Sequence, residues 1–353
     1  MKTADVVVIG AGVIGLSLAC NLRRAGFSVL VLEKHQPGHE ATWAAGGMIA
    51  HCEIGPDISL QQMAKLSAAL YPSFVREIQD ESGVDVDYRS EGKIRFVEEN
   101  IEAWTPKGTI LDNQEVRRLE PEIAFNAPAV LLQESWLDPR KLVEGLVKAA
   151  KHLGVELISG AEVKEIAIEQ GRTVGAITPK ATYGGVAVVN CAGAWSGQFS
   201  PVPIPARPIK GQMLCLVPDR RVLRHVISGN GVYLIPRTDG RIVVGATVED
   251  VGFDKRVDPS AIQALHQRAA NLVPALGEAR IHDSWAGLRP GTPDELPMLG
   301  RTELEGYFVA TGHYRDGILL APATASAMTQ ILAGHEPGID ISRFSPSRFT
   351  LRP

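Results

Sequence analysis

The chain has no excess of charge of either sign. Its 353 residues include 36 Lys and Arg and 40 Asp and Glu, which leaves a net charge of −4. This balance gives no electrostatic reason to bind nucleic acid or an anionic membrane surface, so we predict neither as a partner. Hydrophobic residues make up 45% of the chain and charged residues 22%. These values are typical of globular proteins and exclude a disordered chain.

Cysteine is also scarce. The four cysteines are Cys20, Cys52, Cys191 and Cys215. They form no CxxC pair and none of the spacings that are typical of zinc sites, so we predict no metal. Few and scattered cysteines fit a reducing compartment.

Long apolar runs of the membrane-spanning kind are missing as well. Residues 6–22 and 317–334 carry no charge. The first stretch contains three glycines and has no small-residue cleavage site after it, which argues against a signal peptide. The second contains Pro322 and is short for a bilayer helix of about 20 residues. We therefore expect two buried elements of a cytoplasmic protein, with no membrane span.

Glycine is abundant, with 35 residues, about a tenth of the chain against a usual share of about 7%. The N-terminus shows one use of it. Residues 6–9 are apolar and β-branched, as in a strand that is buried on both faces. A glycine turn, a helix over residues 14–25 that ends at Gly26, and a second strand over residues 28–32 follow. This order predicts a βαβ unit and a sheet that is at least partly parallel.

The glycine turn has the spacing of a dinucleotide-binding motif. Gly10 makes the tight turn, Gly12 lets the backbone approach a pyrophosphate, and Gly15 allows close packing of helix on strand. The N–H groups at the start of the helix favour phosphate. Glu33 ends the second strand, where a carboxylate binds ribose hydroxyls and repels the 2′-phosphate of NADP.

The motif alone does not distinguish FAD from NAD. No second GxGxxG follows a strand, which excludes paired domains for FAD and NAD. Glycine-rich segments recur at residues 44–48, 191–195 and 312–317. A long, extended flavin requires close backbone contact at several such points, so the pattern favours FAD.

In the rest of the chain, α/β segments alternate with segments of short strands and polar turns. Pro72 is expected to kink or divide a helix over residues 60–80, and Asp138-Pro139 is expected to open another. Further helices are expected over residues 260–272 and 317–332. Short strands are expected at residues 93–97, 129–132, 155–158, 186–190, 212–217, 232–235, 242–244 and 307–310. The alternation predicts two domains that are interleaved along the chain.

The sequence resembles the D-amino-acid oxidase superfamily of flavoproteins over essentially its whole length, and within it the glycine oxidases of thiamine biosynthesis. The specific motifs are residues 44–48, Trp285 to Thr292 (WAGLRPGT) and Gly312 to Pro322 (GHYRDGILLAP). The resemblance implies an α/β fold, with a Rossmann-like FAD-binding domain of the D-amino-acid oxidase and p-hydroxybenzoate hydroxylase type and an interleaved antiparallel-sheet substrate domain. The predicted FAD-binding domain comprises residues 1–84, 138–200 and 282–353, and the substrate-binding domain comprises 85–137 and 201–281.

The resemblance also implies a reaction. Glycine, sarcosine or a small D-amino acid is oxidised to an oxo acid and ammonia, and O2 is reduced to H2O2. The alternative is a dehydrogenase of the same fold that passes electrons to a quinone or a partner protein. A homo-oligomer, a tetramer in the family, is implied as well. The cofactor supplies the hydride chemistry, so no catalytic triad is expected.

Three residues are predicted to act on the substrate. The resemblance implies that Arg289 binds the substrate carboxylate, and the planar guanidinium suits this role. It also places Arg315 beside substrate and flavin, and Tyr233 in the active site. The alternatives are arginines paired with acidic residues and a tyrosine of the sheet core. We expect Arg237 to be structural.

The resemblance implies that FAD is bound noncovalently, because Gly287 stands where sarcosine oxidases have the cysteine that attaches flavin. Val248 and Gly231 replace a methionine and a histidine of glycine oxidases, which leaves sarcosine and small D-amino acids open as substrates. Gly317, within the last motif, starts a helix whose N-terminus is expected to face the flavin. Predicted cofactor contacts are Gly10, Gly12, Val13, Ile14, Gly15, Glu33, Lys34, Thr42, Ala44, Ala45, Gly46, Gly47, Met48, Val163, Gly193, Trp195, His313, Arg315, Asp316, Gly317, Ile318 and Leu319.

Overall fold

The N-terminal βαβ unit is present and lies at the centre of a sheet. A computed structural model of the chain describes residues 2–97 and 100–349. Strand β1 (Lys2–Ile9) leads into helix α1 (Val13–Arg24) and strand β2 (Val29–Glu33). β1 pairs in parallel with β2 on one side and with β11 (Thr182–Asn190) on the other. The apolar strand residues are buried from both faces, which confirms the predicted parallel sheet.

The first sheet has eight strands. Its main order is β17-β18-β11-β1-β2-β8, and a hairpin of β9 and β10 pairs with β11. Strands from the middle and from the end of the sequence therefore flank the N-terminal strand. The bounds are β8 (Glu156–Ser159), β9 (Glu165–Glu169), β10 (Arg172–Ile177), β17 (Met298–Arg301) and β18 (Tyr307–Thr311).

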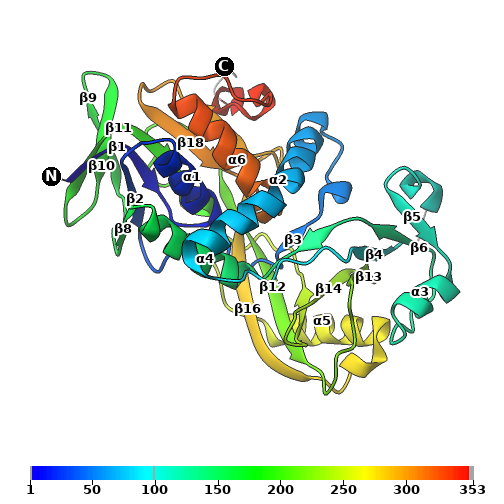
Figure 1. The fold of residues 1–353 in the computed structure, drawn as a ribbon. Helices are drawn as coiled ribbons and strands as arrows, with labels where there is room; N and C mark the ends of the chain where they lie inside the picture. Colours follow the sequence, from blue (N-terminus) through cyan, green and yellow to red (C-terminus); the bar gives the residue numbers. More distant parts are fainter. Residues whose placement is uncertain (1, 98–99, 350–353) are drawn as a thin grey trace.

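Four helices pack together beside this sheet (Figure 1). They are α1, α2 (Ile58–Ser82), α4 (Pro139–His152) and α6 (Gly317–Leu332), and each contacts at least two of the others. Asp138 caps α4 and Pro139 begins it, as predicted. Side chains of α2 bond the first turn of α6: Ser67 Oγ donates to the Leu319 carbonyl at 2.6 Å, and the Tyr71 hydroxyl donates to the Ile318 carbonyl.

The expected division of the helix at Pro72 is wrong. α2 runs through this proline without a break. Pro72 is exposed, whereas Tyr71 and Phe74 are buried against the neighbouring helices. Pro72 removes one N–H from the helix ladder, but the burial of Tyr71 and Phe74 on the other face favours continuation of the helix.

The second sheet also has eight strands, in the order β16-β12-β15-β14-β13-β4-β6-β5. Helix α5 (Pro259–Leu272) covers one face, and the other face turns toward the first domain (Figure 1). Alternate residues of β12, β14 and β15 form the core under α5. The bounds are β4 (Lys93–Phe96), β5 (Gly108–Leu111), β6 (Ala129–Leu132), β12 (Arg207–Val217), β13 (Val226–Gly229), β14 (Val232–Pro236), β15 (Ile242–Gly245) and β16 (Arg280–Gly291).

Short elements complete the structure: α3 (Asn113–Leu119) and a two-stranded ribbon of β3 (Met48–Ile49) and β7 (Ser135–Trp136). The division into domains stays a prediction, and its boundary at residue 282 falls inside β16 rather than in a loop. Within residues 2–97 and 100–349, no helix combines the length and apolarity that crossing a bilayer requires.

Candidate active site

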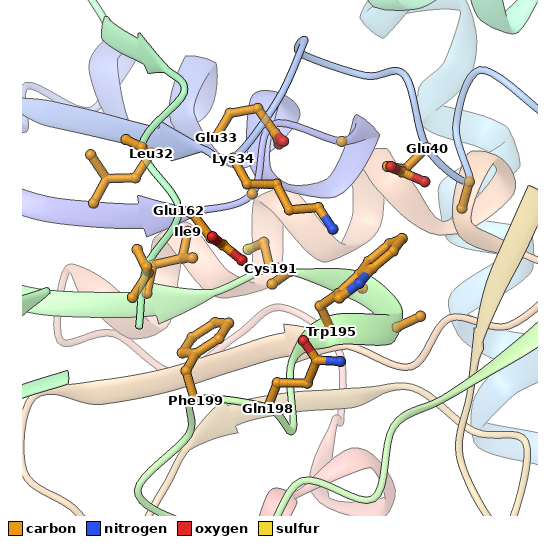
Figure 2. Close-up of a pocket in the computed structure, with 18 of the residues that line it drawn as sticks. Ile9, Leu32, Glu33, Lys34, Glu40, Glu162, Cys191, Trp195, Gln198 and Phe199 are labelled. Carbon is orange, nitrogen blue, oxygen red and sulfur yellow. The ribbon is translucent and has the colours of Figure 1, made fainter. Parts of the chain in front are cut away.

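A cleft opens at the carboxyl ends of β1 and β2, where parallel sheets usually bind nucleotides. Its volume is about 710 Å³, with the solvent at its mouth included. Of the predicted cofactor contacts, Gly10, Gly12, Glu33, Lys34, Val163, Gly193 and Trp195 line it. Figure 2 shows several of these side chains around it. It is also lined by Ile9, Leu32, Glu40, Ala41, Ala161, Glu162, Cys191, Ala192, Ala194, Gln198, Phe199 and Leu288.

Two glycines of the turn at the base of this cleft, Gly10 and Gly15, tolerate no side chain. Gly10 has a φ of +101°, and a Cβ there would lie 2.6 Å from the Cys191 carbonyl oxygen. A Cβ on Gly15 would lie 2.0 Å from the Gly10 carbonyl oxygen. Gly12, the N-cap residue of α1, has no side chain to cap the helix. The Val13 N–H donates to Thr42 Oγ1, and the next N–H groups of the first turn are left for an anion.

Glu33 is held at the rim by backbone donors. Its Oε2 accepts a hydrogen bond from the Ala11 N–H at 2.8 Å, and its Oε1 accepts one from the His35 N–H at 2.9 Å. The next side chain, Lys34, reaches across the cleft, with Nζ 3.5 Å from the centroid of the Trp195 ring (Figure 2). Burial lowers the pKa of Lys34. The carboxylate and the indole thus lie at fixed positions on either side of this lysine.

The segment from Thr42 to Met48 joins the glycine turn to the second sheet. Thr42 Oγ1 accepts a hydrogen bond from the Val13 N–H at 3.0 Å. Gly47 has a φ of +87°, and a Cβ there would lie 2.1 Å from the Leu137 carbonyl oxygen. The buried Arg237 bonds the Leu137 carbonyl at 2.7 Å and the Gly46 carbonyl at 2.8 Å. These contacts are structural, as expected for Arg237.

Two glycines, Gly211 and Gly245, lie on the face of the second sheet that is turned toward this segment. A Cβ on Gly211 would lie 2.2 Å from the Arg289 guanidinium, and a Cβ on Gly245 would lie 2.5 Å from the Tyr233 hydroxyl. Gly211 pairs with β16 and Gly245 pairs with Tyr233 across neighbouring strands. The absence of side chains at these two positions lets Arg289 and Tyr233 lie against the sheet.

Arg289 has no acidic partner among the described residues. Its Nη1 donates instead to the carbonyls of Lys210 and Thr247, each at 3.2 Å. Neutral carbonyls leave the charge of the guanidinium uncompensated. A half-buried, uncompensated guanidinium suits a ligand carboxylate. Within the described residues, Arg289 is therefore not the arginine paired with an acidic residue that the alternative predicted.

Glu249 fixes the two residues whose carbonyls hold Arg289. It accepts hydrogen bonds from Thr247 Oγ1 at 2.5 Å and from Gln212 Nε2 at 2.7 Å, and it pairs with Lys210 Nζ at 3.3 Å. Burial alone raises the pKa of a carboxyl, but these three donors outweigh it, and the pKa of Glu249 is lowered. The guanidinium is therefore positioned through a polar network that no sequence motif predicted.

Tyr233 lies close to both predicted substrate arginines. Burial raises the pKa of its hydroxyl, and the positive charges of Arg289 and Arg315 oppose this shift. The hydroxyl is 3.9 Å from the Met213 sulfur. The three residues predicted to act on the substrate thus come together from β14, β16 and the loop before α6.

The loop of residues 312–316 closes over the end of β16, since the Tyr314 N–H donates to the Pro290 carbonyl at 2.9 Å. Arg315 is exposed and donates to the Tyr314 hydroxyl at 3.1 Å. Burial raises the pKa of Asp316 to about 6. α6 begins at the next residue, Gly317, and no side chain among the described residues caps it. Its first N–H groups are left for an electron-rich ligand atom.

His313 is buried in this loop, with Nε2 3.0 Å from Thr324 Oγ1. Burial lowers its pKa from 6.5 to about 3. The unfolded chain takes up a proton as the pH falls through 6.5, whereas the native imidazole stays neutral. The free energy of unfolding should therefore fall as the pH drops from about 6.5 toward 3, by up to about 1.4 kcal/mol per pH unit.

We expect the His313→Gln variant to lose less stability between pH 7 and pH 4.5 than the wild type, as measured by urea unfolding. Equal losses of stability in the two proteins would contradict a buried, neutral imidazole at His313.

The described residues fit FAD. Gly10 and Gly15 exclude a Cβ, and the N-cap residues of α1 and α6 make no side-chain capping bond. Backbone donors hold Glu33 where ribose hydroxyls are predicted to bind, and the sheet face that carries Gly211 and Gly245 adjoins the segment that follows Thr42. Seven predicted contacts line the cleft, and the other predicted contacts are not among its lining residues.

The comparisons with known proteins agree with this fit. The FAD dependent oxidoreductase family model, DAO, matches residues 5–331. The chain is 32% identical to a glycine oxidase of Pseudomonas aeruginosa over 97% of its own length and 98% of that protein. It is 34% identical to the bifunctional protein ThiO/ThiG of Trichormus variabilis over 98% of its own length, but it spans only 55% of that relative. The crystal structure of glycine oxidase from Geobacillus kaustophilus superposes with a TM-score of 0.93, at 30% identity and 99% coverage of both chains.

The fold and the site define an oxidoreductase that depends on FAD, and the chain belongs to the DAO family. Within this family, the relatives that match over nearly the full length of both chains include glycine oxidases.

Proposed function

We propose that the protein oxidises glycine, sarcosine or a small D-amino acid to the corresponding oxo acid and ammonia or amine, with O2 reduced to H2O2. One observation carries the proposal: the guanidinium of Arg289 has no acidic partner among the described residues. It lies beside Tyr233 on the sheet face that carries Gly211 and Gly245. A carboxylate is the natural ligand of such a cation. The glycine oxidase relatives support the same substrate class.

In this proposal the residues of the chain bind and orient the substrate. Arg289 holds the carboxylate, and the Tyr233 hydroxyl, whose pKa is raised by burial, stays protonated and donates to the same group. FAD, when bound, would supply the hydride acceptor and the route of two electrons to O2. The imine product then takes up water and releases ammonia or amine.

Several properties stay predictions. Noncovalent attachment of FAD follows from Gly287, which provides no thiol. In the structure this glycine abuts Ala44, and a Cβ there would lie 2.4 Å from the Ala44 Cβ. A homo-oligomer and a cytoplasmic location rest on the resemblance and on the composition.

The proposal is tested by adding glycine, sarcosine, D-alanine and D-proline to the yellow, aerobically purified enzyme. We expect at least one of them to bleach the flavin anaerobically and to produce H2O2 in air, one per amino acid consumed. Bleaching without peroxide in air would instead identify a dehydrogenase that uses another acceptor. A flavoprotein that no small amino acid bleaches would refute the proposed substrate class.

A further inference from the structure

A second cluster of chemically active side chains lies beyond the β3–β7 ribbon. It consists of His51, Cys52 and Glu134, whose possible ligand atoms all lie within 4.8 Å of one another. His51 and Cys52 belong to the 3-10 turn His51–Glu53 that follows β3, and Glu134 directly precedes β7. Because β3 and β7 pair antiparallel, the backbone holds the end of one strand beside the start of the other.

The distances within this cluster match a metal centre. His51 Nε2 and Cys52 Sγ are 3.6 Å apart. In a tetrahedral zinc site with Zn–S of about 2.3 Å and Zn–N of about 2.05 Å, the same two atoms lie about 3.6 Å apart. The imidazole nitrogen and the thiol sulfur are therefore already spaced as two ligands of one ion.

The carboxylate supplies the third position. Glu134 Oε1 accepts a hydrogen bond from the Cys52 N–H at 2.9 Å, which fixes the group beside the thiol. Its Oε2 is buried and accepts no hydrogen bond within residues 2–97 and 100–349. The Lys93 ammonium is 3.8 Å from this oxygen but forms its shorter contact with Glu53. Glu134 is only 3% exposed, so its free oxygen is a buried acceptor without a donor.

We propose that His51, Cys52 and Glu134 bind a divalent transition-metal ion of the zinc class. Nitrogen, sulfur and oxygen donors together select such an ion over Mg²⁺ or Ca²⁺, which take oxygen ligands. The thiol gives up its proton on binding, and thiolate and carboxylate then balance the two positive charges. Three protein ligands leave a fourth position for water.

The cluster is also accessible. Cys52 is half-buried, whereas Cys20, Cys191 and Cys215 are buried. An ion can therefore reach this thiol from solvent without unfolding of a core. The site is independent of the proposed amino-acid oxidation and stands or falls separately from it.

The test uses the tag-free holoenzyme, with its cysteine thiols reduced, titrated with CoCl2. We expect one Co²⁺ per chain, with a thiolate-to-cobalt charge-transfer band, d–d bands at longer wavelengths than the flavin absorbs, and loss of both on addition of ZnSO4. Cys52→Ser should abolish the charge-transfer band, and Glu134→Gln should weaken Co²⁺ binding at least about tenfold. Cys215→Ser and His282→Ala, which change the same residue types elsewhere, should bind Co²⁺ like the wild type.

Flavin absorbance per chain and thermal midpoint show whether each variant is folded. If a variant fails this check, alkylation of the wild type replaces it: Zn²⁺ should protect Cys52 from iodoacetamide, as seen by peptide mass spectrometry. A wild type without the cobalt bands although Cys52 is reduced would overturn the proposal. Unchanged bands in a folded Cys52→Ser variant, or alkylation of Cys52 unaffected by Zn²⁺, would also overturn it.

Discussion

Arg289→Lys should lower kcat/KM for the amino-acid substrate roughly 100-fold, mostly through KM, while FAD remains bound. The guanidinium offers two parallel donors to a carboxylate, whereas the ammonium is a single point charge. Losing one hydrogen bond to a charged group costs about 1.5–3 kcal/mol. The lysine is also shorter in reach, and the carbonyls of Lys210 and Thr247 that now fix the guanidinium would hold it differently.

Steady-state kinetics with each accepted amino acid measure this effect, and the visible spectrum reports the flavin content. Arg301→Lys is the matched control, because Arg301 is exposed, bonds the Ile331 carbonyl and does not line the cleft. It should behave like the wild type. Normal KM in Arg289→Lys would remove this residue from the substrate site.

Gly15→Ala should give a protein that does not retain FAD. The new Cβ would lie 2.0 Å from the Gly10 carbonyl oxygen, and neither atom can move without shifting α1 away from β1. Such a shift displaces the helix N-terminus that the phosphates are predicted to contact. Overpacking of this kind commonly costs about 1–3 kcal/mol, and more where backbone is struck. Flavin absorbance per chain and far-ultraviolet circular dichroism together measure the outcome.

Gly26→Ala provides the control at the other end of the same helix. Gly26 has a φ of +92°, but nothing lies within 4 Å of its would-be Cβ. Only the backbone strain of a left-handed alanine remains, about 1 kcal/mol. This variant should stay yellow, at a somewhat lower thermal midpoint. Full FAD content and an unchanged midpoint in Gly15→Ala would contradict the packing argument.

The parts of the fold that local signals encode were predictable. Alternation of a buried β-branched strand, a glycine turn and a helix identified the βαβ unit, and Asp138-Pro139 marked the start of α4. Pro72 misled because proline chemistry alone does not say which face of a helix is exposed. The family resemblance supplied Arg289 and Tyr233, but sequence did not show that the guanidinium rests on bare carbonyls.

The features of the site that could not be predicted from the sequence depend on contacts between distant segments. Glu249 orders the surroundings of Arg289 through side chains on another strand. Glu162 and Phe199 line the cleft without belonging to any motif. The pairing of β3 with β7 brings Glu134 to Cys52 across 82 residues, and a search for closely spaced ligands therefore predicted no metal.

The central position of β1 has a consequence for synthesis of the chain. β1 pairs with residues 182–190, its helix packs on residues 317–332, and the cleft wall extends to Leu288. Contacts of such sequence separation form slowly, because the intervening chain must be closed into a loop first. One edge of β1 pairs early with β2, but the other edge of this apolar strand stays unpaired until residues 182–190 have been translated. FAD can bind only the nearly finished product, and by binding the native state alone it draws folding toward completion.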